Sequence, residues 1–280
     1  MPRPGRVRTR RGFPESRRTR IGARIRWAGG QGGDVALAAT GIIFRREFNA
    51  YLRSPMGYIV AAVVLLIDGI LFYVMALNPP DGELLLSGQA LGRFLYIASG
   101  MTAIAAVALS IRLVAEERQT GTLLLLDTSP VRDWEILLGK FLSALAFLSL
   151  ITVATLYMPM LILVNGKISV GHILIGYLGL TLLGGTVLAI GLFATALTRH
   201  QLVAAAVASL ITGTLFLLWP LAQMVGPPFG RFFAALTIHG RHWVGFEVGT
   251  LHLRDVVYYL AMTYFFLFAA TKVMEAKRWE

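Results

Sequence analysis

A polar stretch between two long apolar runs holds the residues that most suggest a functional role. Residues 115–140 read AEERQTGTLLLLDTSPVRDWEILLGK, and the charged residues Glu116, Glu117 and Arg118 stand near its start. Gly121 weakens helical structure, and the leucines that follow would form an exposed apolar patch if the stretch were only a solvated hairpin. We therefore expect residues 120–127 to form a separate short helix or turn that docks into a groove of another protein.

The next helix is expected to begin at Ser129–Pro130. Serine is a favoured N-cap, and proline is favoured at the first helical position. Asp133 and Glu135 would then lie near the positive end of that helix, where carboxylates are stabilising.

Asp68 is the one charged residue in the apolar run 56–77. A carboxylate inside a membrane is costly, so such a residue predicts a function, here proton or substrate binding. The sequence offers no basic partner within a span. A hydrogen bond from a Tyr or Ser of another span is an equally good explanation.

His239, His242, His252 and Glu247 are residue types that bind metals. Their spacing is irregular and the chain has no cysteine, which favours ordinary surface histidines over a metal site. The sequence also lacks paired intramembrane carboxylates, a His-Glu-x-x-His motif and a Gly-x-Ser-x-Gly elbow. We therefore expect neither a metal centre nor an enzyme active site.

The composition indicates an integral membrane protein. Hydrophobic residues make up 56% of the 280 residues and charged residues only 15%, whereas about a quarter of the residues of soluble domains are charged. Six apolar runs are about long enough to cross a bilayer as helices. They are residues 56–77, 94–111, 141–164, 173–198, 202–225 and 256–271. The sixth is the shortest, and Arg254 and Lys272 can reach the two interfaces from its ends.

The basic residues predict how the spans are oriented. Thirteen of the 26 Lys and Arg residues lie in the first 54 positions, and residues 112–140 and 272–278 add more on the same side. Both termini and the 115–140 stretch are therefore expected in the cytoplasm, in a multi-pass protein of the plasma (inner) membrane. Residues 1–39 read as a basic, disordered tail on anionic lipid, in preference to a nucleic-acid-binding arm or an export signal. Residues 40–280 would form one transmembrane domain.

A helix is predicted ahead of the first span, with Thr40 as its N-cap and Pro55 turning the chain into the membrane. Its aromatic side chains share one face and its arginines another: Phe44, Phe48 and Tyr51 against Arg46, Asn49 and Arg53. This pattern suits a helix lying in the membrane interface. It suits a helix packed on the protein itself equally well.

Two further patterns concern packing. Small residues at Gly176, Gly179, Gly184, Gly185 and Gly191 permit close helix approach, and we favour packing within one subunit over a dimer seam. The aromatic segment 225–249, on the outer side, is expected to form short re-entrant or interfacial helices. The fold predicted from these patterns is all-α, with six transmembrane helices, an N-terminal interfacial helix and a cytoplasmic coupling helix between spans 2 and 3.

The stretch EERQTGTLLLLDTSPVRDWEILLGKF resembles the cytoplasmic loop of ABC-2 type transporter permeases, in the branch of the gliding-motility GldF-like permeases. The resemblance continues in REFNAYLRSPMGYI and FEVGTLHLRDVVYYL, and covers about residues 44–279. Thr250-Leu251-His252 departs from it, because a more acidic or apolar triplet is expected there. The resemblance implies a coupling element that docks on a separate ATPase subunit. Its residues would be Glu116, Glu117, Arg118, Gly121, Thr122, Leu125 and Pro130.

The chain itself has no phosphate-binding loop, which needs Gly-Lys followed by Ser or Thr. Its Gly-Lys pairs are followed by Phe141 and Ile168. We therefore expect no ATPase activity and no directly bound cofactor, with ATP and Mg²⁺ held by the partner subunit. The expected function is a permease half, paired with a second copy or a sister permease, that exports a substrate of unspecified class. A non-transporting anchor that recruits an ATPase to a surface or motility machine is the alternative.

Overall fold

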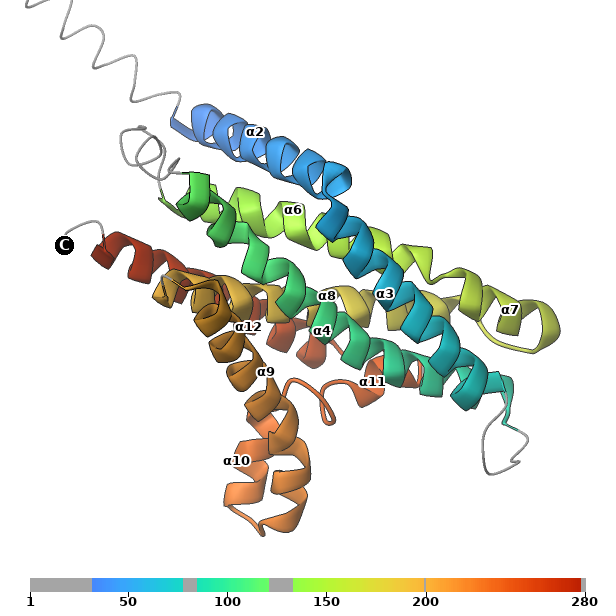
Figure 1. Cartoon of the computed structure of the whole chain (residues 1–280). Helices are drawn as coiled ribbons and strands as arrows, with labels where there is room; N and C mark the ends of the chain where they lie inside the picture. The colour runs from blue at the N-terminus through green and yellow to red at the C-terminus, as the bar shows by residue number, and fades with distance from the viewer. Residues whose placement is uncertain (1–31, 78–84, 121–132, 199, 278–280) are drawn as a thin grey trace, which may run out of the picture.

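The computed structural model describes residues 32–77, 85–120, 133–198 and 200–277, and within these ranges every regular element is a helix (Figure 1). In chain order they are α2 (Gly32–Arg53), α3 (Pro55–Leu71), the π-helical turn η1 (Phe72–Leu77), α4 (Ser87–Thr120), α6 (Asp133–Ala154), α7 (Tyr157–Asn165), α8 (Val170–Leu197), α9 (Gln201–Met224), α10 (Phe229–Leu236), α11 (Val244–Glu247) and α12 (Leu253–Lys277).

Six segments of these helices are long and apolar enough to cross a membrane. They are Pro55–Met75, Ser87–Ile111, Asp133–Val164, Val170–Leu197, Gln201–Met224 and Leu253–Lys277. Each contains or closely matches one of the predicted apolar runs, which confirms a multi-pass helical protein. The sixth is longer than its run because Arg254 and Lys272 belong to the helix instead of flanking it.

The bundle has two ends, which we name by the elements that meet there. At the loop end, α4 finishes, α6 begins and α12 finishes, and at the far end, α4 begins and α7 finishes (Figure 1). Helix α2 lies along α6 at the loop end, while α9 diverges from the bundle and leads to α10. The sequence expectation places the loop end in the cytoplasm.

Helix α8 forms the centre of the bundle, packed between α4 and α12. Its glycines make this possible, because a side chain on Gly176 would collide with Leu95 and one on Gly184 with Leu148. A side chain on Gly191 would likewise collide with Ser110. These contacts lie within one chain, which confirms that the glycine stripe serves packing inside the subunit.

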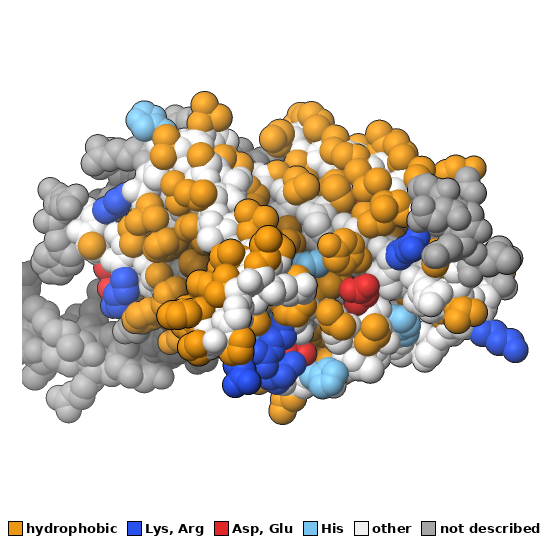
Figure 2. Space-filling view, turned by 90° about the horizontal axis from the view of Figure 1, so that it is seen from below, with side chains coloured by type: hydrophobic (Ala, Val, Ile, Leu, Met, Phe, Trp, Pro, Cys, Tyr) orange, Lys and Arg blue, Asp and Glu red, His pale blue; other side chains and the backbone are white. Residues whose placement is uncertain are grey.

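The outward faces of the peripheral helices are apolar. Leu66 of α3, Leu210 and Leu217 of α9, and Tyr264 of α12 are all well exposed. Figure 2 shows one face of the molecule covered mostly by hydrophobic side chains, with charged side chains in a few small groups. Such surfaces are expected to contact lipid or another membrane-embedded subunit.

The third span is interrupted between α6 and α7. Tight turns replace the regular pattern there, since Thr155 N–H donates to Thr152 O and Leu156 N–H to Val153 O. Pro159 lies in the first turn of α7, where its missing N–H is least costly. Pro159 therefore marks a break within the span, whereas Pro220 lies inside the continuous helix α9.

The observed position of helix α2 corrects two predictions from the sequence, the end of the disordered tail and the N-cap of this helix. It begins at Gly32, so residues 32–39, assigned by sequence to the disordered tail, are helical. The Thr40 N-cap prediction is wrong, because Thr40 lies in mid-helix and its hydroxyl contacts Glu135 O of α6, 3.5 Å away. Ser54 is the N-cap that the next helix uses: its hydroxyl accepts a hydrogen bond from Met56 N, and Pro55 follows as the first helical residue.

Candidate functional site

The predicted coupling element lies only partly within the described residues. Helix α4, which contains the second membrane-crossing segment, extends as far as Thr120. Glu116, Glu117 and Arg118 are therefore on a helical extension of the second span. The predicted coupling helix and the Ser129 N-cap lie outside the described residues. So do the remaining predicted coupling residues, Gly121, Thr122, Leu125 and Pro130.

Helix α2 joins the two helices that flank this element. The Tyr51 hydroxyl donates to Leu109 O of α4, 3.2 Å away, and its ring stacks on Phe147 of α6 at 5.1 Å between centroids. Further along α2, Ile43 packs so closely on Gly139 of α6 that a methyl group there would approach Ile43 Cγ2 to 2.9 Å. Movement of α4 relative to α6 would therefore disturb α2 as well.

The aromatic face of α2 is used for packing on the protein. Tyr51 is buried and Phe48 packs against the core, while Phe44 stacks on Phe48 at 5.7 Å. Arg46 pairs with the neighbouring Glu47 at 2.7 Å, and Arg53 is exposed. Of the two sequence interpretations, packing on the protein holds for this face. Lipid contact by Tyr51 is wrong, because the residue is buried and its hydroxyl donates to the carbonyl of Leu109. The predicted position of α2 in a membrane interface stays a prediction.

A cavity of about 460 Å³ lies between α4 and α9. Ile104 and Val107 of α4 face Ala205, Thr212 and Phe216 of α9 across it. The Thr212 hydroxyl is buried and finds no hydrogen-bond partner within the described part of the chain. Sequence analysis missed this cavity. The signal available was the series of small residues along α9 at positions 205, 209, 212 and 213.

Asp68 is buried on α3, with 3% of the residue exposed. Its Oδ1 has no hydrogen-bond partner among the residues described, so the expected Tyr or Ser donor is not found at that atom. The break in the third span lies on the same side, since Tyr157 Oη lies against the neighbouring Gly69. Tyr177 of α8 is also close enough to Asp68 to interact with it electrostatically.

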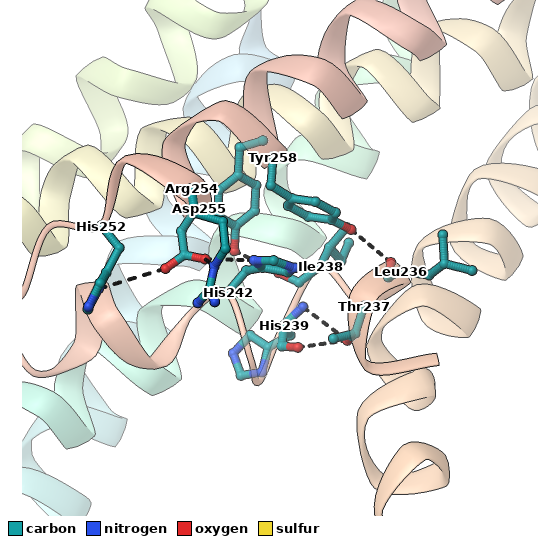
Figure 3. A network of polar contacts seen from close by, with 10 residues as sticks. Leu236, Thr237, Ile238, His239, His242, His252, Arg254, Asp255 and Tyr258 are labelled. Carbon is teal, nitrogen blue, oxygen red and sulfur yellow. Dashed lines mark hydrogen bonds and ion pairs between the residues drawn. The ribbon is translucent and has the colours of Figure 1, made fainter. Parts of the chain in front are cut away.

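At the far end, a second buried carboxylate is fully engaged (Figure 3). Asp255 Oδ1 lies 2.7 Å from His242 Nδ1 and 3.2 Å from Arg254 Nε, and His252 Nδ1 lies 3.9 Å from Oδ2. Because a carboxylate only accepts hydrogen bonds, His242 carries its proton on Nδ1. The His242 ring also stacks on Tyr258, with centroids 3.9 Å apart.

His239, which precedes His242 in the chain, packs this segment against neighbouring helices. Its ring lies between Phe216 and Trp243, at centroid distances of 5.0 and 5.8 Å. The Ser99 hydroxyl donates to Tyr96 O at 2.6 Å, so His239 Nε2–H donates to Ser99 Oγ at 2.9 Å. Burial lowers the pKa of His239 to about 4, which keeps the ring neutral at neutral pH.

The surface-histidine prediction is therefore wrong for His239 and His242, which are buried, and holds for His252. Glu247 has its pKa raised by burial, and its backbone carbonyl accepts a hydrogen bond from His172 Nε2 at 2.7 Å. Among the described residues, no three His, Cys, Asp or Glu side chains are grouped to hold a metal ion. These side chains hold the far end together.

Comparison with known proteins identifies the family. The sequence profile of the ABC-2 family transporter proteins matches residues 41–277, which include every membrane-crossing helix. No curated protein matches the chain. The profile covers well over half of the sequence and agrees with the six apolar helices, so the chain belongs to the ABC-2 family of transporter proteins.

Proposed function

We propose that this ABC transporter permease couples ATP hydrolysis by a separate nucleotide-binding subunit to the export of a substrate. ATP and Mg²⁺ bind to that subunit, and residues 116–130 of the permease form the contact. A second copy or a sister permease completes the pathway. The resemblance to the gliding-motility branch stays a prediction.

The connection of α2 to both α4 and α6 is the observation that carries this proposal. Tyr51 fixes α2 to α4 through Leu109 and to α6 through Phe147. Residues 121–132 therefore join two helices that are tied to each other through a third. A push on the 116–130 loop is transmitted along α4, which is one helix from Ser87 to Thr120 and packs along the central α8.

The cavity between α4 and α9 supports translocation as the result of that movement. It is lined mainly by apolar side chains, with Ser209 and Thr212 as polar groups. Helix α9 buries only Ala204, Ala208 and Thr212 within the described part of the chain, so much of its surface is free for lipid or a second permease. A second permease placed against α9 would enclose the cavity as part of a pathway.

The experiment is to purify the tagged chain in mild detergent and test for an ATPase subunit in stoichiometric amount. The Glu117→Ala, Gly121→Pro double variant should lose the ATPase because it alters the contact. A matched control is Lys272→Ala with Glu275→Ala, which removes an exposed ion pair at the same end of the bundle. That control should retain the ATPase. The coupling proposal would be contradicted if no ATPase subunit co-purified with the native chain, or if the loop variant retained the ATPase fully.

A membrane anchor would also bind an ATPase, so a second variant is needed to separate the two functions. Gly213 lines the cavity, and a Cβ atom added there would meet no atom within 4 Å. Because the Cβ position is free and faces the cavity, Gly213→Leu is expected to place its side chain in the cavity. In a transporter, it should abolish stimulation of the ATPase by substrates while the complex remains intact. An anchor would show no such loss.

A further inference from the structure

Asp68 combines two features that are unfavourable in a membrane helix: it is buried, and one of its oxygens lacks a partner. The residue is 3% exposed, and no described residue forms a hydrogen bond with Oδ1. We propose that Asp68 is a proton-binding site, whose proton is exchanged when the interrupted third span moves. The proposed coupling function does not use this residue.

Two hydroxyl groups on the side of Asp68, those of Thr155 and Tyr177, have already committed their hydrogens. Thr155 Oγ1 donates to Thr152 O at 2.7 Å, and Tyr177 Oη lies 2.9 Å from Thr155 Oγ1. Because Thr155 has only one hydroxyl hydrogen, Tyr177 is the donor in the second bond. The Tyr177 oxygen therefore presents only acceptor lone pairs to other groups. Such surroundings disfavour a carboxylate, which needs donors, and favour a carboxylic acid.

The groups around Asp68 offer little to balance a negative charge. Tyr157 of α7 and Tyr177 of α8 are the titratable residues that face it from these two helices. On the side of α4, Phe94 packs edge-on against Phe72, one turn beyond Asp68. Helices α2 and α6 meet α3 at Gly57, about three turns away, through Tyr51 and Phe147. An ionised, unpaired carboxylate here would cost several kcal/mol.

The size of the site distinguishes a proton from other cations. A hard metal cation requires about six oxygen ligands, whereas Asp68 has two hydroxyl-bearing neighbours and an apolar surround. An organic cation needs a wide entrance to reach the carboxyl group, and only 3% of the residue is exposed. A proton requires neither space nor a ligand shell, so it fits these observations best.

The interruption of the third span provides a way to expose the site. Breaks in transmembrane helices are tolerated where they line a site or cavity, and they often carry ion-binding groups. Thr155 lies in this break and holds Tyr177 beside Asp68. If α7 moves relative to α6, water reaches the carboxyl group, which gives its proton to water and later takes one back. No electrons are transferred, and water is the only co-reactant.

Dicyclohexylcarbodiimide is a suitable probe, because this apolar reagent enters membranes and adds to protonated carboxyl groups. The full chain in lipid nanodiscs is treated from about pH 6 to about pH 9, a range that brackets documented buried carboxyl groups. The label on each peptide is then measured by mass spectrometry. Asp255 is an internal control, because it is equally buried but ion-paired. The Asp68 peptide should be strongly labelled at the acidic end, less at the alkaline end, and the Asp255 peptide hardly at all.

Two variants complete the test. Asp68→Asn should abolish labelling of that peptide, and Tyr177→Phe, which keeps Asp68 but removes the neighbouring oxygen, should shift the pH at which labelling falls. If Asp68→Asn does not fold, Tyr177→Phe and the pH series on the native chain decide the matter. An unlabelled Asp68 across the range, or labelling that does not change with pH, would overturn the proposal. This readout requires no ATPase, so it stays informative if the coupling proposal fails.

Discussion

The two buried aspartates, Asp68 and Asp255, are the same residue type placed in opposite environments. They are 3% and 1% exposed, and both lie in helices that cross the membrane. Asp255 accepts from His242 at 2.7 Å and from Arg254 at 3.2 Å, whereas Asp68 Oδ1 has no partner among the described residues. A buried polar group with partners can support the fold, but one without partners weakens it. The difference indicates a structural role for Asp255 and supports the function proposed for Asp68.

The side chains around the two aspartates also differ in the hydrogen-bond donors that they offer. Around Asp255, nitrogen donors from two segments converge on Oδ1 (Figure 3). Around Asp68, the hydroxyl of Thr155 points its hydrogen to Thr152 O, and that of Tyr177 points to Thr155. The donors at the far end therefore stabilise an ionised Asp255, whereas the hydroxyl groups of Thr155 and Tyr177 do not stabilise an ionised Asp68.

The largest expected effect comes from removing the engaged carboxylate. Asp255→Leu leaves His242 buried without its partner, and breaking a buried pair in this way costs about 3 to 5 kcal/mol. Thermal unfolding in detergent should show a large loss of stability. The control is the double variant His242→Phe, Asp255→Leu, which keeps a ring stacked on Tyr258 and should recover much of the loss. Equal losses in both variants would mean that the pair is not the cause.

The buried histidines extend the comparison to a pH effect of similar size. Burial lowers the pKa of His239 to about 4, whereas an unfolded histidine has a pKa of about 6.5. Above pH 6.5 both states are neutral, and as the pH falls towards about 4 only the unfolded state gains a proton. Stability should therefore decrease with falling pH over that window, by about 3 kcal/mol at most.

The measurement is unfolding of the native chain and of His239→Gln at neutral and acidic pH. The glutamine variant can still donate to Ser99 but cannot titrate, so its stability should fall less. If the two chains lose stability equally, other groups are responsible for the acid sensitivity.

At Asp68, removing the carboxyl group is expected to raise stability, not to lower it. Asp68→Leu removes a buried polar group that lacks a partner, so stability should rise by about 1 to 3 kcal/mol. Asp68→Asn keeps a polar group in place and should gain much less. A loss of stability in Asp68→Leu would show that the carboxyl group has a partner in the folded protein and would remove the contrast with Asp255.

The fold was accessible from sequence because the membrane imposes simple demands. A helix that crosses hydrocarbon must be apolar for its whole length, so the runs at 56–77 and 141–164 were visible directly. The start of α2 was not, because the residues from Gly32 to Thr40 carry no clear amphipathic pattern and no cap. Neighbouring helices and tertiary contacts, such as Thr40 with Glu135 O, determine where α2 lies.

The polar sites could be predicted from the sequence only in part, because the residues that contact them are distant in the sequence. Asp68 was recognised from its place in an apolar run. The burial of His239 depends on Ser99, which lies 140 residues away, and no local pattern indicates that contact. The break in the third span lies next to Pro159, but its relation to Asp68 depends on the positions of Tyr157 and Tyr177, which the sequence does not show.

The smallest expected effect concerns the hydrogen bond that separates the two environments. Tyr177→Phe removes the donor to Thr155 at 2.9 Å but leaves Thr155 bonded to Thr152, so the loss should be about 1 kcal/mol. Thr155→Val should cost a similar amount, and the double variant should cost less than the sum if the two hydroxyls act as one unit. Unfolding of the three variants measures this coupling. Strict additivity would mean that the hydroxyls are independent, and Tyr177 would then no longer hold its oxygen towards Asp68 through Thr155.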